Sequence, residues 1–249
     1  IAIEVNKPDA IEAVTNAAKD FSEVEVVGLQ VKYPQGAEKQ LIYACTGREV
    51  PSGALPAAAG AVVDNVATAS QIAKTIKTGM PLIERITTVT GSCIKKPANL
   101  ITKVGTPVSE IIEQCGGFKE DVKVGKLIMG GPMMGMTQYT TNIVTNKGSS
   151  GILCISDKEA RLPEPSNCLR CGRCTQVCPA FLQPLYISAN SLKGDFDKAE
   201  EHRALDCIEC GSCSFICPAR RPLVESIRNA KRQIQAKRRK AQAQAKAAK

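Results

Sequence analysis

CLRCGRCTQVCP (168–179) and CIECGSCSFICP (207–218) are two copies of one cysteine run, C-x2-C-x2-C-x3-C-P. This spacing is typical of chains that hold a pair of 4Fe–4S clusters. The first three thiolates of a run bind one cluster, and the fourth thiolate binds the other cluster. The sequence therefore predicts a first cage of Cys168, Cys171, Cys174 and Cys217, and a second cage of Cys207, Cys210, Cys213 and Cys178.

Other residues of the runs favour the same interpretation. Pro179 and Pro218 end the local helix and turn the chain away, and Gly172 and Gly211 let backbone amides approach the cluster sulfides. The alternative is a pair of structural zinc sites, but zinc usually takes its ligands from two pairs separated by a longer spacer. Two clusters in one crossed framework lie close together, which suits the relay of single electrons.

The remainder of the cysteine region is predicted to be helical. Twenty-eight residues separate Cys178 from Cys207, and within them 180–193 and 195–205 have helical patterns. This predicts a helical ferredoxin domain rather than the compact β-hairpin form. A last amphipathic helix follows the second run as far as Ile234. Only Ala, Gln, Lys and Arg come after Ile234, so we expect a solvated or frayed helix there.

Composition and charge narrow the class of protein. The chain has 249 residues, enough for one large domain or two to three small ones, and 43% of them are hydrophobic, which allows a core. Its net charge of +9 belongs to residues 228–249, which contain nine Lys and Arg and no acid. No apolar run approaches membrane-spanning length and no signal peptide opens the chain, so we expect it to be soluble. Cysteines in tight CxxC runs indicate metal binding in a reducing compartment rather than disulfides.

The N-terminal segment, 1–80, is predicted to be part of an open α/β sheet. Strands are expected at 2–5 and 24–31, on either side of a helix that begins near Pro8. Further helices are expected at 38–47 and at 65–79, where the second ends on a glycine. Because the sequence begins with Ile rather than Met, directly in a strand-like run, we expect a further segment upstream.

Residues 81–147 are predicted to form a ubiquitin-like β-grasp. A β-branched strand at 85–91 and a short helix at 108–117 precede a strand that runs into a glycine-rich turn, 123–135. The motif GGPMMG (130–135) follows a strand but precedes no convincing helix, so we interpret it as a turn rather than a phosphate loop. The ferredoxin domain (148–234) and a basic tail (235–249) complete an α+β multidomain chain.

The cysteines outside the runs have no ligand spacing around them. Cys115 lies on a helical apolar stripe and Cys154 in an apolar strand, and Cys45 and Cys93 have no nearby partner. All four are expected to be small buried hydrophobes. His202, the single histidine, lies among charged residues and is expected at the surface.

Several motifs together resemble one family. They are VNKPDAI, KYPQGAEKQLIYACTGREVP, DNVATA, the stretch from RITTVTG to VGTPV, IMGGPMMG and both cysteine runs. Along its whole length the chain resembles the C subunit of the Rnf electron transport complex, RnfC or RsxC. The resemblance implies a partial Rossmann-like α/β flavin domain like that of complex I, a β-grasp of the soluble-ligand-binding (SLBB) type and a helical two-cluster ferredoxin domain. The implied cofactors are two 4Fe–4S clusters and FMN, with NADH as substrate.

The resemblance also implies a function. Family members are electron-transfer subunits of a membrane-bound, ion-translocating NADH:ferredoxin oxidoreductase, a translocase that moves sodium ions or protons. The implied partners are the membrane subunits, the ferredoxin-like B subunit and NAD(H). The implied location is peripheral, on the cytoplasmic face of the bacterial inner membrane. The alternative is an iron–sulfur subunit of a glycolate-oxidase or heterodisulfide-reductase type, but the cysteine-rich partner motifs of those proteins are absent here.

Flavin-site residues carry over from the family only in part. Tyr33 matches a tyrosine presented to flavin and nicotinamide, and Glu38 matches the second of two paired glutamates; Ala37 stands where the first glutamate would be, so that contact is lost. The residues that match the flavin phosphate and ribityl contacts are Asp64, Asn65 and Thr68. The family's Gly-rich loop, whose amides supply most of the phosphate binding, would lie upstream of residue 1. We therefore expect residues 1–249 alone to bind flavin weakly or not at all and to be inactive.

The basic tail raises a different possibility, a nucleic-acid protein. Its charge would give salt-sensitive, non-specific binding, but no recognised reading module accompanies it, and low aromatic content argues against stacking on single strands. No nucleic-acid partner is expected. Acidic partner subunits or anionic lipid headgroups fit the tail better.

Overall fold

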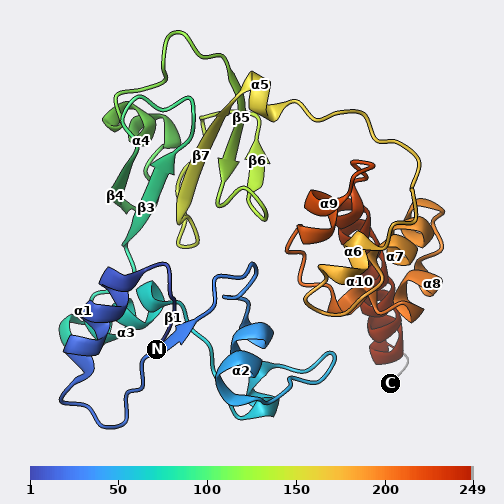
Figure 1. Ribbon diagram of the computed structural model, residues 1–249, viewed down its shortest axis with the longest axis horizontal. Helices are drawn as coiled ribbons and strands as arrows, with labels where there is room; N and C mark the ends of the chain where they lie inside the picture. The colour runs from blue at the N-terminus through green and yellow to red at the C-terminus, as the bar shows by residue number, and fades with distance from the viewer. Residues whose placement is uncertain (248–249) are drawn as a thin grey trace. The chain divides into compact units, whose positions relative to one another are not determined.

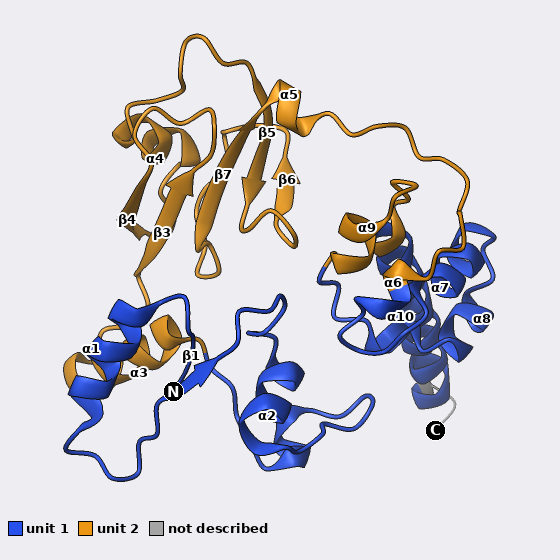
Figure 2. Ribbon diagram, in the orientation of Figure 1, with its two compact units in different colours: residues 1–64, 175–210, 225–249 blue, residues 65–174, 211–224 orange. Residues whose placement is uncertain are grey.

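The computed structural model describes residues 1–247 and divides into two compact units, coloured in Figure 2. The first unit contains Ile1–Asp64, Thr175–Cys210 and the chain from Glu225 onward. The second unit contains Asn65–Cys174 and Gly211–Val224. Each cysteine run therefore contributes residues to both units.

The N-terminal part of the first unit is a β-α-β arrangement. Strands β1 (Ala2–Glu4) and β2 (Val27–Leu29) pair in parallel around α1 (Pro8–Ala18), which has Pro at its first turn (Figure 1). The expected strand over 24–31 is confirmed only in its middle. Helix α2 (Glu38–Thr46) ends on Gly47 in the left-handed conformation, and a 3-10 turn, η1 (Pro56–Ala59), follows.

The C-terminal part of the first unit is helical, as the sequence predicted. It contains α7 (Pro184–Leu192), α8 (Phe196–Glu201), the 3-10 turn η2 (Ala204–Asp206) and most of α10 (Leu223–Ala247). These elements share one core, in which each large apolar side chain contributes about 1.5–3 kcal/mol. The buried residues of this core are Leu182, Ile187, Ala199, Ala204, Ile227, Ala230 and Ile234.

Helix α10 continues well beyond its last buried side chain. Ile234 is buried, whereas residues 235–246 are all exposed, which agrees with the expected solvated helix. Lys237 pairs with Asp197, and Arg238 pairs with Glu200, so α8 holds part of the basic tail. Lys249, the last residue of the predicted basic tail, lies outside the described residues.

The second unit begins with α3 (Val66–Thr78), and its ends agree with the prediction. The Asn65 side chain accepts a hydrogen bond from the Ala67 amide, which caps the start of the helix. Gly79 ends it with a left-handed φ of 70°.

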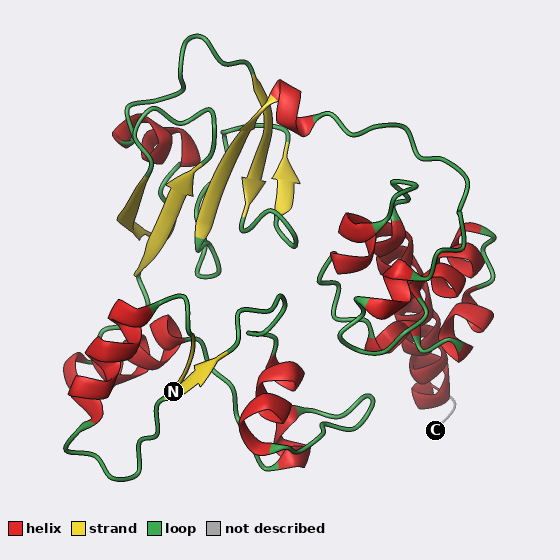
Figure 3. Cartoon of the chain, in the orientation of Figure 1, coloured by secondary structure: helices red, strands yellow, loops and turns green. Residues whose placement is uncertain are grey.

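A mixed five-stranded sheet forms the body of the second unit (Figure 3). The strand order is β4-β3-β7-β5-β6, so the first and last strands of the sheet lie side by side at its centre. They pair in parallel, whereas all other neighbours are antiparallel. Helix α4 (Val108–Gln114) packs against the sheet. The strands are β3 (Glu84–Thr90), β4 (Ala98–Lys103), β5 (Val124–Met129), β6 (Met136–Gln138) and β7 (Gly151–Ser156).

This strand order and single helix confirm the β-grasp. Strand β7 is a central strand, so the sheet extends past residue 147, the predicted end of this domain. The other segment boundaries stay predictions. The core between sheet and α4 is formed by Val89, Cys93, Ile94, Val108, Ile111, Ile112, Cys115, Leu127, Ile152 and Cys154.

One expectation about a cysteine was wrong, and His202 is less exposed than a free surface residue. Cys45 is exposed rather than buried, because it lies on the solvent side of α2, whose one buried residue is Ile42. His202 is partly buried, with its ring stacked 5.5 Å from the ring of Tyr186. Cys93, Cys115 and Cys154 are buried in the β-grasp core, as expected.

Three short helices complete the chain. Helix α5 (Asp157–Ala160) begins at a capping box in which Ser156 and Glu159 bond each other's backbone amides. The cysteine runs contain α6 (Arg173–Gln176) and α9 (Ser212–Ile216). Among residues 1–247, the structure has no helix that combines the length and apolar character needed to span a membrane.

Candidate iron–sulfur cages and flavin segment

The two cysteine runs repeat the same unusual backbone. Arg170 and Glu209 occupy the same place, one residue before the second cysteine, and both have left-handed φ, 53° and 58°. Gly172 and Gly211 directly follow the second cysteine of their runs, and both have left-handed φ, 74° and 82°. A left-handed conformation costs a non-glycine residue about 1–3 kcal/mol. Its repetition at matching positions indicates that both runs are shaped for the same task.

The repeat continues through the end of each run. Phe181 and Arg220 each lie three residues after the fourth cysteine, and both have φ of 52°. The short helices α6 and α9 start directly after the glycines and carry the third cysteine of each run. Each run therefore has left-handed backbone at two places, around its second cysteine and three residues after its fourth cysteine.

Backbone amides are directed at the cysteine sulfurs. The Arg170 amide donates to Cys168 Sγ and the Glu209 amide to Cys207 Sγ, both at 3.4 Å. The Leu182 amide donates to Cys178 Sγ at 3.3 Å. Hydrogen bonds to cluster sulfurs are one of the means by which a protein sets cluster potential.

Cysteines from different runs share the same cores. In the first unit, Cys178 and Cys207 pack against one helical core. In the second unit, Cys174 and Cys217 pack against a small core that includes Cys213. These are the run-crossing neighbours that the proposed ligand sets require. The ligand assignment itself stays a prediction.

Positive charge is concentrated beside Cys207. Glu209 bonds Arg228 at 2.8 Å and Lys231 at 2.7 Å, and the Lys231 ammonium also donates to the Cys207 carbonyl at 2.7 Å. Burial raises the pKa of Glu209, but hydrogen bonds from Lys231 and Arg228 outweigh burial, and the pKa lies below its usual value. The two positive charges from α10 outnumber the one carboxylate of Glu209, which leaves one net positive charge beside Cys207.

The two runs differ in exposure. Cys168 and Cys171 are exposed, whereas Cys210 and Cys213 are buried. Within residues 1–247, no three His, Cys, Asp or Glu side chains approach closely enough to hold one metal ion.

The glycine-rich motif of the β-grasp is a turn, as expected. The Gly135 amide bonds the Gly131 carbonyl at 2.8 Å, and strand β6 follows rather than a helix. Its Met133 carbonyl oxygen lies only 2.8 Å from where a Cβ on Gly211 would be. The turn thus touches the second cysteine run at a position that only glycine can occupy without a shift.

The expected flavin residues fall in different places. Tyr33 precedes α2 and is half-exposed, and its hydroxyl donates to the Cys210 carbonyl at 2.8 Å. Burial, and then the neighbouring Cys210, raises the pKa of Tyr33. Glu38 is the exposed first residue of α2, and Asp64 is exposed at the end of the first unit's N-terminal segment.

The other two expected flavin residues, Asn65 and Thr68, belong to the second unit. The Asn65 side chain already serves as the cap of α3, and Thr68 is partly buried in that helix's first turn. Sequence reasoning missed two further residues that contact the cysteine region. Gln40 donates to the Pro179 carbonyl at 3.1 Å, and Ser52 donates to an Asp206 carboxylate oxygen at 2.6 Å. No motif marks either residue, because each contact spans more than 130 residues.

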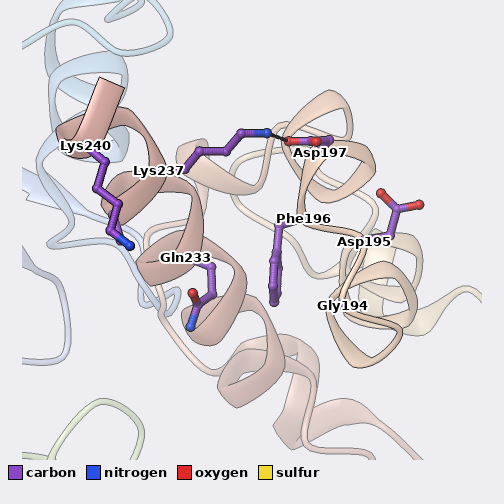
Figure 4. Close-up of a pocket in the computed structure, with 8 residues that line it drawn as sticks. Gly194, Asp195, Phe196, Asp197, Gln233, Lys237 and Lys240 are labelled. Carbon is purple, nitrogen blue, oxygen red and sulfur yellow. Dashed lines mark hydrogen bonds and ion pairs between the residues drawn. The ribbon is translucent and has the colours of Figure 1, made fainter. Parts of the chain in front are cut away.

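A hollow of about 340 Å³ lies between α8 and α10 (Figure 4). None of the residues that line it is a cysteine. Phe196 and Gln233 point into it from the two helices, and the Lys237–Asp197 ion pair lies at its edge. Its small, charged lining offers none of the thiolates that iron–sulfur chemistry needs.

The residues present fit two 4Fe–4S clusters. The repeated left-handed turns, the amides directed at sulfur and the shared cysteine cores are all features of a chain wrapped around such groups. The fold and site define an iron–sulfur electron-transfer protein with an attached α/β segment.

Family models match three parts of the chain. Residues 1–74 match the Nuo51 FMN-binding domain, residues 86–137 match the SLBB domain, and residues 162–238 match the 4Fe-4S dicluster domain. The three matches follow the order α/β segment, β-grasp and cysteine-bearing helical region that the structure shows.

Comparisons along nearly the whole chain identify the family. The C subunit of the Na(+)-translocating ferredoxin:NAD(+) oxidoreductase complex of Acetobacterium woodii is 57% identical over 240 residues, covering 96% of this chain and 54% of the relative. The proton-translocating counterpart of Clostridium ljungdahlii is 51% identical, covering 93% and 50%. The C subunit of an ion-translocating oxidoreductase complex of Rhodobacter capsulatus is 47% identical, covering 93% and 44%. The chain belongs to this family of C subunits, and it spans about half the length of these relatives.

Proposed function

We propose that this chain is the part of an electron-transfer subunit that relays electrons between an NADH-linked flavin and two 4Fe–4S clusters. The observation that carries the proposal is the repeated left-handed backbone at equivalent positions of both cysteine runs. Two runs that accept the same strain at the same places are built for two copies of one group. The FMN-binding match over residues 1–74 supplies the flavin end of the relay.

The proposed cages follow the crossed pattern of the motif. Cys168, Cys171 and Cys174 hold the first cluster together with Cys217, and Cys207, Cys210 and Cys213 hold the second together with Cys178. The shared packing of Cys174 with Cys217, and of Cys178 with Cys207, supports this assignment. When bound, the clusters supply the one-electron chemistry. The chain supplies cysteine ligands, amide hydrogen bonds and the positive charge of α10.

The flavin contacts are a separate part of the proposal. Tyr33 and Glu38 would lie at the flavin and nicotinamide, and Asp64, Asn65 and Thr68 would lie along the flavin phosphate and ribityl chain. Tyr33 lies in the turn before α2 and Glu38 is the first residue of that helix, and the exposure of both side chains supports their role. Asn65 would serve the flavin only in addition to capping α3.

The names of the relatives support a proposal for the complex and its location. Their names describe subunits of ferredoxin:NAD(+) oxidoreductase complexes that translocate sodium ions or protons. We propose the same role for this protein, with membrane subunits, the ferredoxin-like B subunit and NAD(H) as partners. Its place would be peripheral, on the cytoplasmic face of the bacterial inner membrane. The glycolate-oxidase or heterodisulfide-reductase alternative is not favoured by these relatives.

Metal analysis tests the function directly. Protein purified without oxygen should contain iron and acid-labile sulfide in equal amounts, and its reduced form should give the EPR signals of two interacting clusters. Replacing Cys171 or Cys210 with Ser should each remove one cluster and leave the β-grasp folded. Colourless protein that contains zinc and no sulfide would refute the proposal.

A further inference from the structure

Three hydrogen bonds connect the N-terminal segment to the cysteine region within the first unit. The Tyr33 hydroxyl donates to the Cys210 carbonyl at 2.8 Å. The Gln40 amide donates to the Pro179 carbonyl at 3.1 Å, and the Ser52 hydroxyl donates to Asp206 at 2.6 Å. The three donors come from the turn before α2, from α2 itself and from the loop after it.

All three acceptors belong to one proposed cage. Cys210 is a ligand of the second cage, Pro179 directly follows its ligand Cys178, and Asp206 directly precedes its ligand Cys207. The N-terminal segment therefore reaches this cage at three separate ligand positions. Three contacts around one site fix both the position and the orientation of the two parts, whereas a single contact would leave rotation free.

The contact surface is closed to solvent at its centre. Gln40 Oε1 is buried and has no hydrogen-bond partner among the described residues. The Asp206 side chain is only 13% exposed. A buried polar atom without a hydrogen-bond partner lowers the free energy of unfolding by about 1–3 kcal/mol, so such atoms are rare in folded proteins. The burial of Gln40 Oε1 and of the Asp206 side chain places both groups away from water where α2 and the loop after it meet the chain around the second cage.

We infer that the flavin segment docks on the second cage, so that Cys207, Cys210, Cys213 and Cys178 hold the cluster that exchanges electrons with the flavin. The inference rests on the proposed function and adds the order of the relay to it. Tyr33, Gln40 and Ser52 are positioning residues, because they touch the chain around the cage and set how closely the flavin segment approaches. Electron transfer slows steeply with distance, so a docked cage is the first acceptor.

The first cage then exchanges electrons with a partner. Its ligands Cys168 and Cys171 are exposed, which leaves it open to a redox protein from outside the chain. When bound, each cluster would accept one electron at a time, so the two electrons from each NADH would leave the flavin in two steps, and the one proton released as NADH becomes NAD+ would pass to solvent.

Single-cage variants test this order. The full-length subunit, loaded with FMN and both clusters, would be compared with its C171S variant, which keeps the second cage, and its C210S variant, which keeps the first. After mixing with NADH, rapid-freeze EPR records reduction of the remaining cluster, with iron content measured on the same samples. We expect parental reduction rates in C171S and at least tenfold slower reduction in C210S. The opposite ranking, or equal rates, would overturn the order. If NADH reduces the flavin but no cluster even in the parent, the proposed function fails instead.

A second measurement tests the docking without any turnover. In a triple variant, Tyr33→Phe, Gln40→Ala and Ser52→Ala, the three donors are removed while all eight proposed ligands stay. Hydrogen exchange should increase at residues 206–211 although iron content is unchanged. Tyr43→Phe, which alters an exposed tyrosine of α2, is the matched control and should leave exchange there unchanged. Unaltered exchange in the triple variant would refute the docking whatever the cluster signals show.

Discussion

At the scale of single residues, Gly172 and Gly211 are equivalent in sequence but differ in their surroundings. Both have left-handed φ, so a side chain at either is strained by about 1–2 kcal/mol. A Cβ on Gly172 meets no atom within 4 Å, whereas a Cβ on Gly211 would lie 2.8 Å from the Met133 carbonyl oxygen. The two positions therefore form a natural pair for separating conformational strain from a steric clash.

We predict that Gly211→Ala costs more than Gly172→Ala. Both variants carry the strain of the left-handed backbone, but only Gly211→Ala must also displace the 130–135 turn, which adds about 1–3 kcal/mol. Denaturant titration of the reconstituted protein measures the two free energies of unfolding. Equal losses in the two variants would show that the Met133 contact has no energetic weight.

Lys231 provides a test of how charge sets a cluster potential. Its ammonium donates a hydrogen bond to the Cys207 carbonyl. A positive charge at this place favours the reduced state of a nearby cluster, because that state carries one more negative charge. We predict that Lys231→Met lowers the midpoint potential of the second cluster by tens of millivolts, since about 59 mV corresponds to about 1.4 kcal/mol for one electron.

The measurement is an EPR-monitored redox titration. Arg232→Met removes the same charge one residue further along α10, from an exposed position, and serves as control. If both variants shift the potential equally, the effect is one of overall charge and not of the contact with Cys207.

At the scale of elements, the β-grasp holds its cysteines as buried thiols. Burial, and then the neighbouring Cys93, raises the pKa of Cys154 to about 12 from the ordinary 9.0. A thiol with a raised pKa in the folded state contributes stability that is fully present below about pH 9. That stability is lost as the pH rises from about 9 towards 12, because the unfolded chain gives up its proton first.

We therefore predict that Cys154→Ala makes stability fall less steeply between pH 9 and 12 than in the parent. Thermal unfolding at several pH values in this window gives the two slopes. Alkylation at pH 8 followed by mass spectrometry adds a direct check, since exposed Cys45 should react readily and Cys154 should not. Rapid alkylation of Cys154 in folded protein would contradict the buried-thiol assignment.

Helix α10 shows how one element serves two purposes. Its first turns bury Ile227 and Ile234 in the helical core, and Arg228 and Lys231 pair with Glu209 beside the second run. Its last turns are exposed, with Lys237 and Arg238 paired to α8. These exposed pairs contribute little to stability, because water and salt screen the two charges.

At the scale of the whole molecule, the two kinds of core depend on metal differently. All ten buried residues of the β-grasp core lie between Val89 and Cys154, outside the cysteine runs. The two cores of the cysteine region instead include proposed cluster ligands or are bordered by them. Folding of that region is therefore linked to cluster binding, since metal binding and folding share one free energy.

We predict that removing iron with a chelator under oxidising conditions loosens the cysteine region and leaves the β-grasp intact. Hydrogen exchange should rise across α7, α8 and α9 and stay low across β3, β5 and β7. Re-addition of iron and sulfide under reducing conditions should restore protection. A uniform rise over both regions would mean that the chain unfolds as a single cooperative unit.

Much of this architecture was available from local sequence signals. Glycines at 47 and 79 mark the ends of α2 and α3, because a left-handed residue is needed where a helix ends. The helices between Cys178 and Cys207 follow from apolar periodicity. Strand β7 was placed outside the β-grasp because its parallel partner, β3, lies about 60 residues earlier, and nothing local marks such a pairing. For the same reason the exposure of Cys45 and the stacking of His202 were missed.

The sequence by itself determined the chemistry: eight cysteines at fixed spacing predict two cubane cages, because ligand number and spacing are local properties of the chain. Only the tertiary structure decided which cage meets the flavin segment. The contacts of Tyr33, Gln40 and Ser52 join residues 139–177 positions apart in the sequence, and packing alone brings such distant residues together.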